Sequence, residues 1–324
     1  TFEQGDASTD ERSLGRLRSG PPRIAPLFSD LDPSRGGGIR VLAEPGRFVV
    51  SWVEVPEFRD FGAGSRQTFQ VRLYPDGRIE SAWNGVAIQS AVAGISPGGM
   101  RGTFDVVSLG EGSAREFAGT VGERFGSSLS VDLVSAAFQF YATHDDAYDV
   151  LIFFNSLGIT NRPGAVAYET TLRNNRAGIG DPPIDIGREY GSGRRLQAII
   201  NMQSLETYPI DPNGIVPLRA SSRDTPLTIL GHETGHLFLA YASVRDPSSP
   251  WARPMLSADR FHWNFYFNSD ASLVEGNRIE DRGVNVSPRF LTAAVTQGYS
   301  ALDQYLMGLL PAGEVAPTFF VANP

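Results

Sequence analysis

Apolar and polar residues alternate over several short runs in the first third of the chain. The clearest runs span residues 47–53, 68–74 and 78–83, and Pro75-Asp76-Gly77 links the last two. Alternation with a period of two places every second side chain on one face of a strand. A Pro-Asp-Gly link is typical of a tight turn in which glycine supplies the positive φ. Several short strands with regular turn signals predict an all-β sandwich over residues 23–125.

The residues before this region have a different texture. Residues 1–22 are polar, charged and interrupted by glycine and proline, and they show neither the strand period nor the helix period. This segment is therefore interpreted as a flexible lead-in with little regular structure.

After residue 126 the apolar spacing lengthens to three or four residues. Apolar residues recur at this spacing from Leu129 to Tyr141, which predicts an amphipathic helix. Two strands are expected at 149–154 and 195–202, and a second helix is expected over 226–240. This order predicts an α+β, zincin-like catalytic domain over residues 126–324, so the fold class is multidomain. In such a domain, the strand preceding the metal-bearing helix is expected to pair with extended substrate at a sheet edge.

Composition narrows the chemistry that this chain can perform. It has 324 residues, no cysteine, four histidines and a formal net charge of −8. Disulfides and thiolate metal sites are excluded, so a transition metal must be bound by histidine and carboxylate side chains. No basic cluster is present to neutralise phosphates, which argues against a nucleic-acid partner. No run of 18 apolar residues is present to form a membrane span.

The segment His232-Glu233-Thr234-Gly235-His236 carries the strongest functional signal. Thr225 is a helix-capping residue type and Pro226 suits the first helical position, so the motif is expected on a helix. His232 and His236 then lie one turn apart on the same side and can bind one Zn²⁺. Glu233 lies beside the metal, where a carboxylate can act as the general base for a zinc-activated water.

The third zinc ligand is less well determined by the sequence. The long metzincin signature is excluded, because residues 237–243 contain neither glycine nor histidine. His262 ranks first because imidazole is the commoner zinc ligand, and Asp303 is an alternative or additional ligand. Tyr305 is a candidate for stabilising the transition state through its phenol.

Two parts of the sequence resemble known families. Residues 25–32, 68–79 and 92–98 resemble, in the same order, the nidogen-like β-sandwich module of extracellular proteins. The segments 232–236, 262–263, 274–277 and 299–309 resemble a group of uncharacterised, secreted bacterial proteins described as zinc metallopeptidases. The resemblances imply a secreted, extracellular protein with an accessory β-sandwich, but they supply neither an established third ligand nor a substrate.

Together these observations predict a zinc-dependent metallopeptidase that acts as a monomer on protein or peptide substrates. The alternative is an extracellular adhesion or matrix-binding protein whose zincin domain is inactive. A third reading keeps the zinc but assigns another hydrolytic substrate, such as a glycan-linked peptide.

Overall fold

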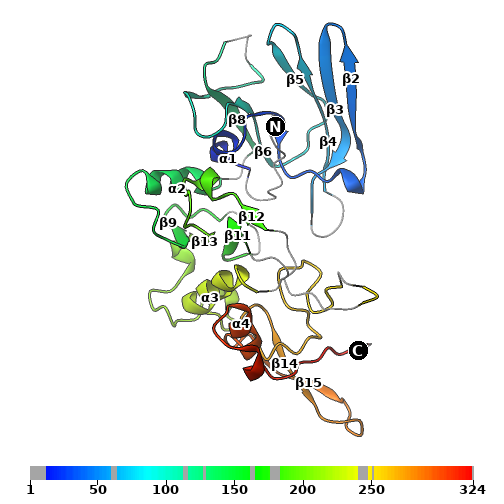
Figure 1. The fold of residues 1–324 in the computed structure, drawn as a ribbon, viewed down its shortest axis with the longest axis vertical. Coiled ribbons are helices and arrows are strands. Elements are labelled where there is room, and N and C mark those ends of the chain that lie inside the picture. Colours follow the sequence, from blue (N-terminus) through cyan, green and yellow to red (C-terminus); the bar gives the residue numbers. More distant parts are fainter. Residues whose placement is uncertain are drawn as a thin grey trace. The chain divides into compact units, whose positions relative to one another are not determined.

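The computed structural model describes residues 12–59, 64–111, 116–126, 129–160, 165–175, 183–239, 247–249 and 252–322 (Figure 1). Contacts divide the chain into two compact units. The first contains Thr1–Asp145 and Arg188–Ser192, and the second contains Asp146–Gly187 and Gly193–Pro324. Strands outnumber helices in the described residues, and they form several separate sheets. The prediction of a β-rich chain with more than one compact part is therefore confirmed at this coarse level.

One sheet of the first unit contains the three strands predicted from alternation. It is antiparallel, and its order is β2 (Gly38–Glu44), β3 (Arg47–Pro56), β4 (Arg66–Leu73) and β5 (Ile79–Trp83). Trp52 lies opposite Phe69 in the register, and Phe69 lies opposite Trp83, so large aromatic side chains share one face. The predicted turn is present: Gly77 has φ 87° and its N–H donates to the Tyr74 carbonyl at 3.0 Å.

The second sheet of this unit has the order β1 (Arg23–Phe28), β6 (Ser90–Ser96), β8 (Thr120–Gly126) and β7 (Phe104–Val106). Leu27 of β1 and Ala91 of β6 form a buried cluster with Phe69 of β4. The two sheets therefore share a core, as expected for layered β structure.

The expectation of a flexible lead-in over residues 1–22 is corrected for part of that segment. Helix α1 (Leu14–Ser19) begins at the N-cap Ser13, and its Leu17 is fully buried against Ala25 and Val92. The sequence pattern missed this helix because six residues are too few to show a helical period. Residues 1–11 lie outside the described residues.

The helix predicted from Leu129 to Tyr141 is present as α2 (Leu133–Tyr141), which begins four residues later than expected and belongs to the first unit. Its N-cap residue Asp132 accepts hydrogen bonds from the Ser13 hydroxyl at 2.9 Å and from the Gly15 N–H at 2.7 Å. These bonds tie α2 to α1, so the first unit extends to Asp145, beyond the boundary expected at residue 125.

A three-stranded sheet forms the centre of the second unit. Its order is β10 (Tyr168–Thr171), β13 (Ala198–Ser204) and β9 (Val150–Asn155), with β13 parallel to β9 and antiparallel to β10. The strands expected at 149–154 and 195–202 are thus confirmed as β9 and β13. One expectation is wrong: β13, the strand before the helix with the histidine motif, is paired on both sides, so it offers no free edge to a peptide.

Helix α3 (Pro226–His236) packs on β10 and β13. Ile229 of α3 joins a buried cluster with Ile200 and Met202 of β13. The remaining elements of this unit are β11 (Arg173–Asn174), β12 (Ile184–Asp185), β14 (Asn277–Asp281), β15 (Phe290–Val295) and α4 (Ala301–Leu306). In the described part of the chain, no helix is long and apolar enough to cross a membrane.

Candidate metal centre

Helix α3 carries the histidine motif and is capped as the sequence predicts. The Thr225 hydroxyl accepts the Thr228 N–H at 3.2 Å, and the Thr228 hydroxyl accepts the Thr225 N–H at 2.8 Å, which forms a capping box. Pro226 occupies the start of the helix. The helix ends at His236, earlier than the expected residue 240, which lies outside the described residues. The second histidine is therefore the last helical residue.

Two glycines let a distant segment approach the motif closely. A Cβ atom added to Gly231 would lie 2.7 Å from Leu273 Cδ2, and one added to Gly235 would lie 3.0 Å from Val274 Cγ2. Both distances are shorter than ordinary carbon contacts. The Tyr299 hydroxyl also contacts the helix here, because it donates a hydrogen bond to the Gly231 carbonyl. The glycines of the motif thus create room for residues 273–274 against the helix.

The segment at Leu273 fixes the protonation of the first histidine. Nδ1 of His232 lies 2.9 Å from the Leu273 carbonyl oxygen. A carbonyl only accepts, so Nδ1 carries the proton and Nε2 of the neutral ring keeps its lone pair. That Nε2 lies 3.0 Å from Nε2 of His236.

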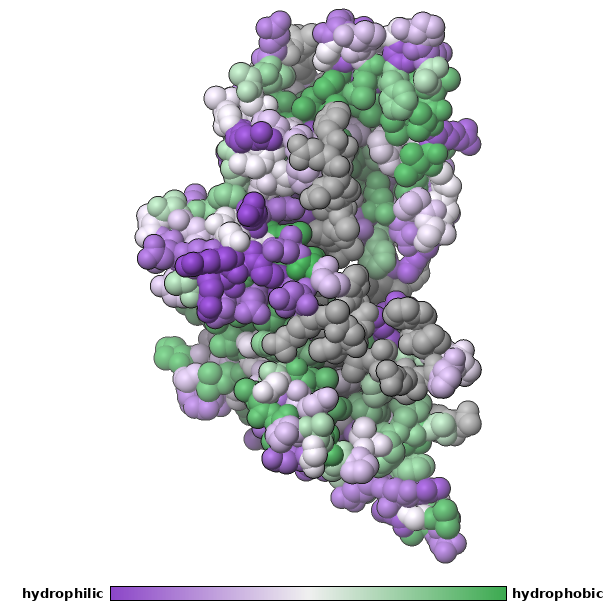
Figure 2. Space-filling model, in the orientation of Figure 1, coloured by the Kyte–Doolittle hydropathy of each residue, from purple (hydrophilic) through white to green (hydrophobic). Residues whose placement is uncertain are grey.

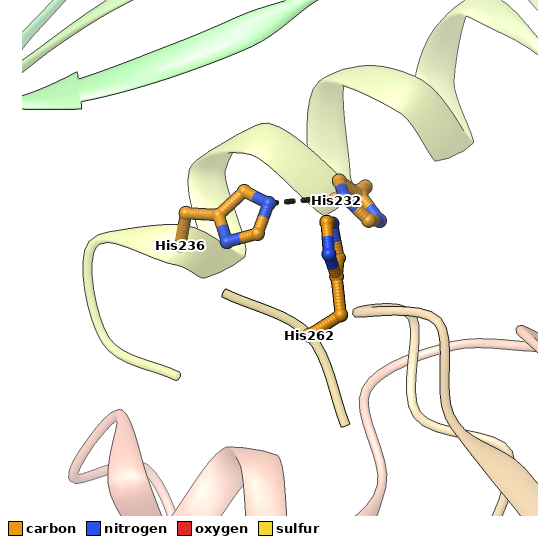
Figure 3. A group of neighbouring side chains, drawn as sticks. All are labelled: His232, His236 and His262. Carbon is orange, nitrogen blue, oxygen red and sulfur yellow. Dashed lines mark hydrogen bonds between the residues drawn. The ribbon is translucent and has the colours of Figure 1, made fainter. Parts of the chain in front are cut away.

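The third histidine of the group is His262, which comes from a different segment. Its Nδ1 lies 2.8 Å from Asp259 Oδ2, and a carboxylate partner again places the proton on Nδ1. One ligand nitrogen from each of His232, His236 and His262 lies within 4.8 Å of the other two. Figure 3 shows the three rings converging, two from α3 and one from the segment that carries His262. Among the described residues, this is the group of side chains placed to hold a metal ion.

The donor set fits Zn²⁺. Two nitrogens bound to one tetrahedral zinc at about 2.0–2.1 Å lie about 3.3 Å apart. The observed 3.0 Å between the Nε2 atoms of His232 and His236 is close to that value. A metal ion held by three protein side chains keeps a fourth position open for water or another ligand.

The surroundings keep the two helical histidines neutral. Burial is the largest cause that lowers the pKa of His232, and the nearby His262 adds to it. Burial lowers the pKa of His236 further, with help from His232. For His262, burial lowers the pKa, but the hydrogen bond to Asp259 and the charge of Glu275 outweigh it, so the pKa is raised. Neutral imidazoles are the form that binds metals.

Glu233 is buried beside the histidines, with 6% of its surface exposed. Its negative charge adds to burial in raising the pKa of the Tyr208 phenol, and it also contributes to the raised pKa of His262. The Tyr208 hydroxyl itself donates to the Val166 carbonyl at 2.9 Å. The Glu233 carboxylate therefore lies within electrostatic reach of both His262 and the Tyr208 phenol.

The structure does not bring Asp303 or Tyr305 into the histidine group. Asp303 is fully buried and forms the capping box of α4 with Ser300, whose N–H donates to Asp303 Oδ2 at 2.8 Å. Burial is the largest cause of its raised pKa. Tyr305 lies on α4 and is 44% exposed.

Sequence reasoning missed the residues that support His262. Asp259 accepts the N–H groups of Phe261 at 2.9 Å and of His262 at 3.3 Å, as well as the Ser257 hydroxyl. Burial raises the pKa of Asp259, but these hydrogen bonds and that from the His262 ring outweigh it, so the pKa lies well below its usual range. The sequence does contain one signal for this arrangement. An aspartate side chain often accepts the backbone N–H two residues later in a turn, as Asp259 does from Phe261.

Glu275 and Arg219 lie near this support. Glu275 Oε2 is 4.0 Å from His262 Nδ1, and Glu275 Oε1 is 3.8 Å from Arg219 Nη2. Glu275 has φ 52°, which is uncommon for a residue with a long side chain. The same short segment, Leu273 to Glu275, therefore contacts two of the three histidines.

Asp259 gives a prediction that depends only on metal binding. Asp259→Asn removes the charge behind His262, so zinc affinity is expected to fall by about 10–100-fold, as for other partners of ligating histidines. Competition with a coloured chelator measures the affinity. Asp76→Asn, in an exposed turn of the first unit, is the matched control and should bind zinc like the parent. Unchanged affinity of Asp259→Asn would show that His262 needs no carboxylate partner.

Comparisons with known proteins give no match: no family model, curated protein or solved structure is similar enough to this chain to be paired with it.

Proposed function

We propose that this chain is a zinc-dependent metallopeptidase in which His232, His236 and His262 hold the metal. The observation that carries the proposal is the convergence of these three imidazoles, with Nδ1 of His232 and of His262 bonded to an acceptor and each Nε2 left for a metal. When bound, zinc supplies Lewis-acid activation of water and of the scissile carbonyl. Three imidazoles this close would repel one another if they were protonated. A bound metal ion gives a reason for holding them together, and a metal-free role does not.

Glu233 is the general base in this proposal. It follows the first ligand directly, is buried, and remains close enough to affect His262 electrostatically. Its carboxylate takes a proton from the attacking water and returns it to the leaving amine, which is the usual way in which one carboxylate serves both halves of amide hydrolysis. Burial also shields it from bulk water, so its hydrogen bonds are stronger than on an exposed surface.

The role of the first unit and the location of the protein are parts of the same proposal. The shared core of its two sheets is compatible with an accessory β-sandwich of the nidogen-like kind. An extracellular, bacterial setting rests on the sequence resemblance alone.

Metal content separates this proposal from a non-enzymatic adhesion role. Purified chain should contain about one zinc, and His232→Ala should contain far less after the same dialysis, because the remaining two imidazoles bind weakly. Elemental analysis measures the zinc. Chelation should abolish cleavage of a diverse peptide library, and added zinc should restore it. A parent chain that binds no zinc and cleaves no peptide would refute the proposal.

A further inference from the structure

A cavity of about 240 Å³ lies in the second unit, next to the end of helix α3. Three arginines contribute to its wall: Arg173 of β11, and Arg194 and Arg195 from the segment before β13. It is called the arginine pocket below. Figure 2 shows hydrophilic side chains gathered over this part of the second unit, around β9 and β11. None of the three metal-binding histidines lines the pocket.

Two of the arginines are held in place by the protein. Arg173 Nη1 donates to the Leu196 carbonyl at 3.3 Å, and its Nη2 lies 3.0 Å from Asp185 Oδ1. Arg195 Nη2 donates to Asp149 Oδ2 at 2.7 Å. Guanidinium groups fixed in this way lose little further freedom when a ligand binds, which favours affinity.

The third arginine is the most available to a ligand. The Arg194 guanidinium makes one long hydrogen bond, from Nη2 to the Asp146 carbonyl at 3.5 Å. Its backbone is nevertheless fixed, because the Asp146 carboxylate accepts the N–H of Arg194 at 2.9 Å and that of Arg195 at 3.3 Å. Arg194 can therefore direct most of its five N–H donors towards a group in the pocket.

The wall of the pocket offers an anion the guanidinium of Arg194, with neutral amides beside it. The lining carries three arginines against one carboxylate, Asp149, while its other polar members are the neutral amides Asn174, Asn175 and Gln197. Because Arg173 is paired with Asp185 and Arg195 with Asp149, Arg194 is the cation of the wall that can meet an added anion. An oxyanion can satisfy several of these donors at once through charge-assisted hydrogen bonds.

The size of the pocket limits the ligand to a small group. A volume of about 240 Å³ lies below the roughly 300–1,000 Å³ of common small-molecule sites. It suits one side chain or one chain terminus better than a whole cofactor. Leu237 and Phe238 add an apolar part to the wall, which suits the methylene groups that precede a carboxylate.

We propose that the arginine pocket binds a carboxylate group of an acidic peptide. Planar guanidinium forks match the planar carboxylate in a bidentate arrangement. Leu237 directly follows His236, so a peptide anchored here would lie beside the helix that carries the metal motif. The binding proposal goes beyond the proposed peptidase activity and does not depend on it.

Titration calorimetry on the zinc-depleted full chain tests the pocket, since no metal is then present to bind the carboxylate. The probes are N-acetyl-glutamate amide for a side-chain carboxylate, N-acetyl-alanine for a terminal carboxylate, and inorganic phosphate. At least one of the two peptide carboxylates is expected to bind in the millimolar range. N-acetyl-glutamine amide, which has the same shape without the charge, should bind at least tenfold more weakly than N-acetyl-glutamate amide if the side chain is the ligand.

Variants connect that binding to the pocket. Arg194→Gln should weaken binding of the peptide carboxylate by about tenfold, the loss of a charge-assisted hydrogen bond. Arg194→Lys should fall between Arg194→Gln and the parent, and Arg40→Gln, on an exposed strand of the first unit, should bind like the parent. Unchanged binding by a folded Arg194→Gln chain would overturn the proposal, as would the absence of binding by both peptides or equal binding of phosphate. Retained carboxylate binding by a chain without peptidase activity would overturn only the proposed function.

Discussion

Replacing Glu233 by glutamine is expected to lower peptide cleavage by about 10²–10⁴-fold while zinc stays bound. Glutamine preserves the shape of the side chain but cannot take a proton from water. The three imidazoles remain in place, so metal content should not change. Initial rates on a peptide that the parent chain cleaves, together with elemental analysis of the same samples, measure both quantities.

The control for this variant is Glu314→Gln. Glu314 lies in the short helical turn Ala312–Glu314 and is exposed, so this change should leave cleavage unaltered. Because Glu233 is buried, thermal unfolding must show that the glutamine variant is folded. Turnover equal to that of the parent in a folded, zinc-loaded Glu233→Gln chain would reject Glu233 as the base.

The second large effect concerns the third ligand. His262→Ala should weaken zinc binding more than the roughly 10–100-fold expected for a supporting residue, because it removes a ligand nitrogen itself. The remaining pair, His232 and His236, lies on a single helix and supplies two ligands, whereas protein zinc sites normally supply at least three. Competition with chelators of graded affinity measures the loss.

Two other variants make this prediction specific. His144→Ala removes the fourth histidine, which stacks on Phe140 in the first unit, and it should bind zinc like the parent. Asp303→Asn should also keep its zinc, since Asp303 belongs to the capping box of α4 and not to the three converging imidazoles. If Asp303→Asn lost zinc as completely as His262→Ala, the assignment of the third ligand would be wrong.

Local sequence signals were sufficient for much of the fold. The strands β3, β4 and β5 follow from alternation of apolar and polar residues, and the turn between β4 and β5 follows from one glycine with positive φ. Helix α3 follows from a capping threonine and a proline at its start. Each of these signals lies within a few residues of the structure that it determines, which is why the sequence alone reveals it.

The positions of the candidate metal ligands could be predicted only in part from local sequence. His232 and His236 are related by one helical turn, so their proximity follows from helix geometry. His262 and Asp303 were hard to rank because their positions depend on contacts between segments distant in sequence. The decisive contact joins Leu273 and Val274 to the two glycines of the motif, and no periodic pattern encodes it. Likewise, α1 is too short to show a helical period in the sequence, and the burial of Leu17 becomes apparent only in the structure.

The short stretch Arg188–Ser192 bears on how this protein can be dissected in the laboratory or recombined in evolution. It is separated in sequence from the rest of the first unit, which ends at Asp145, but it belongs to that unit. There Glu189 pairs with the fully buried Arg16. A fragment truncated after Asp145 would remove Glu189 from its place beside that buried guanidinium, and losing the partner of a buried charge destabilises a fold. The chain therefore cannot be divided into its two units by a single cut. A fragment designed to contain the first unit must also contain Arg188–Ser192.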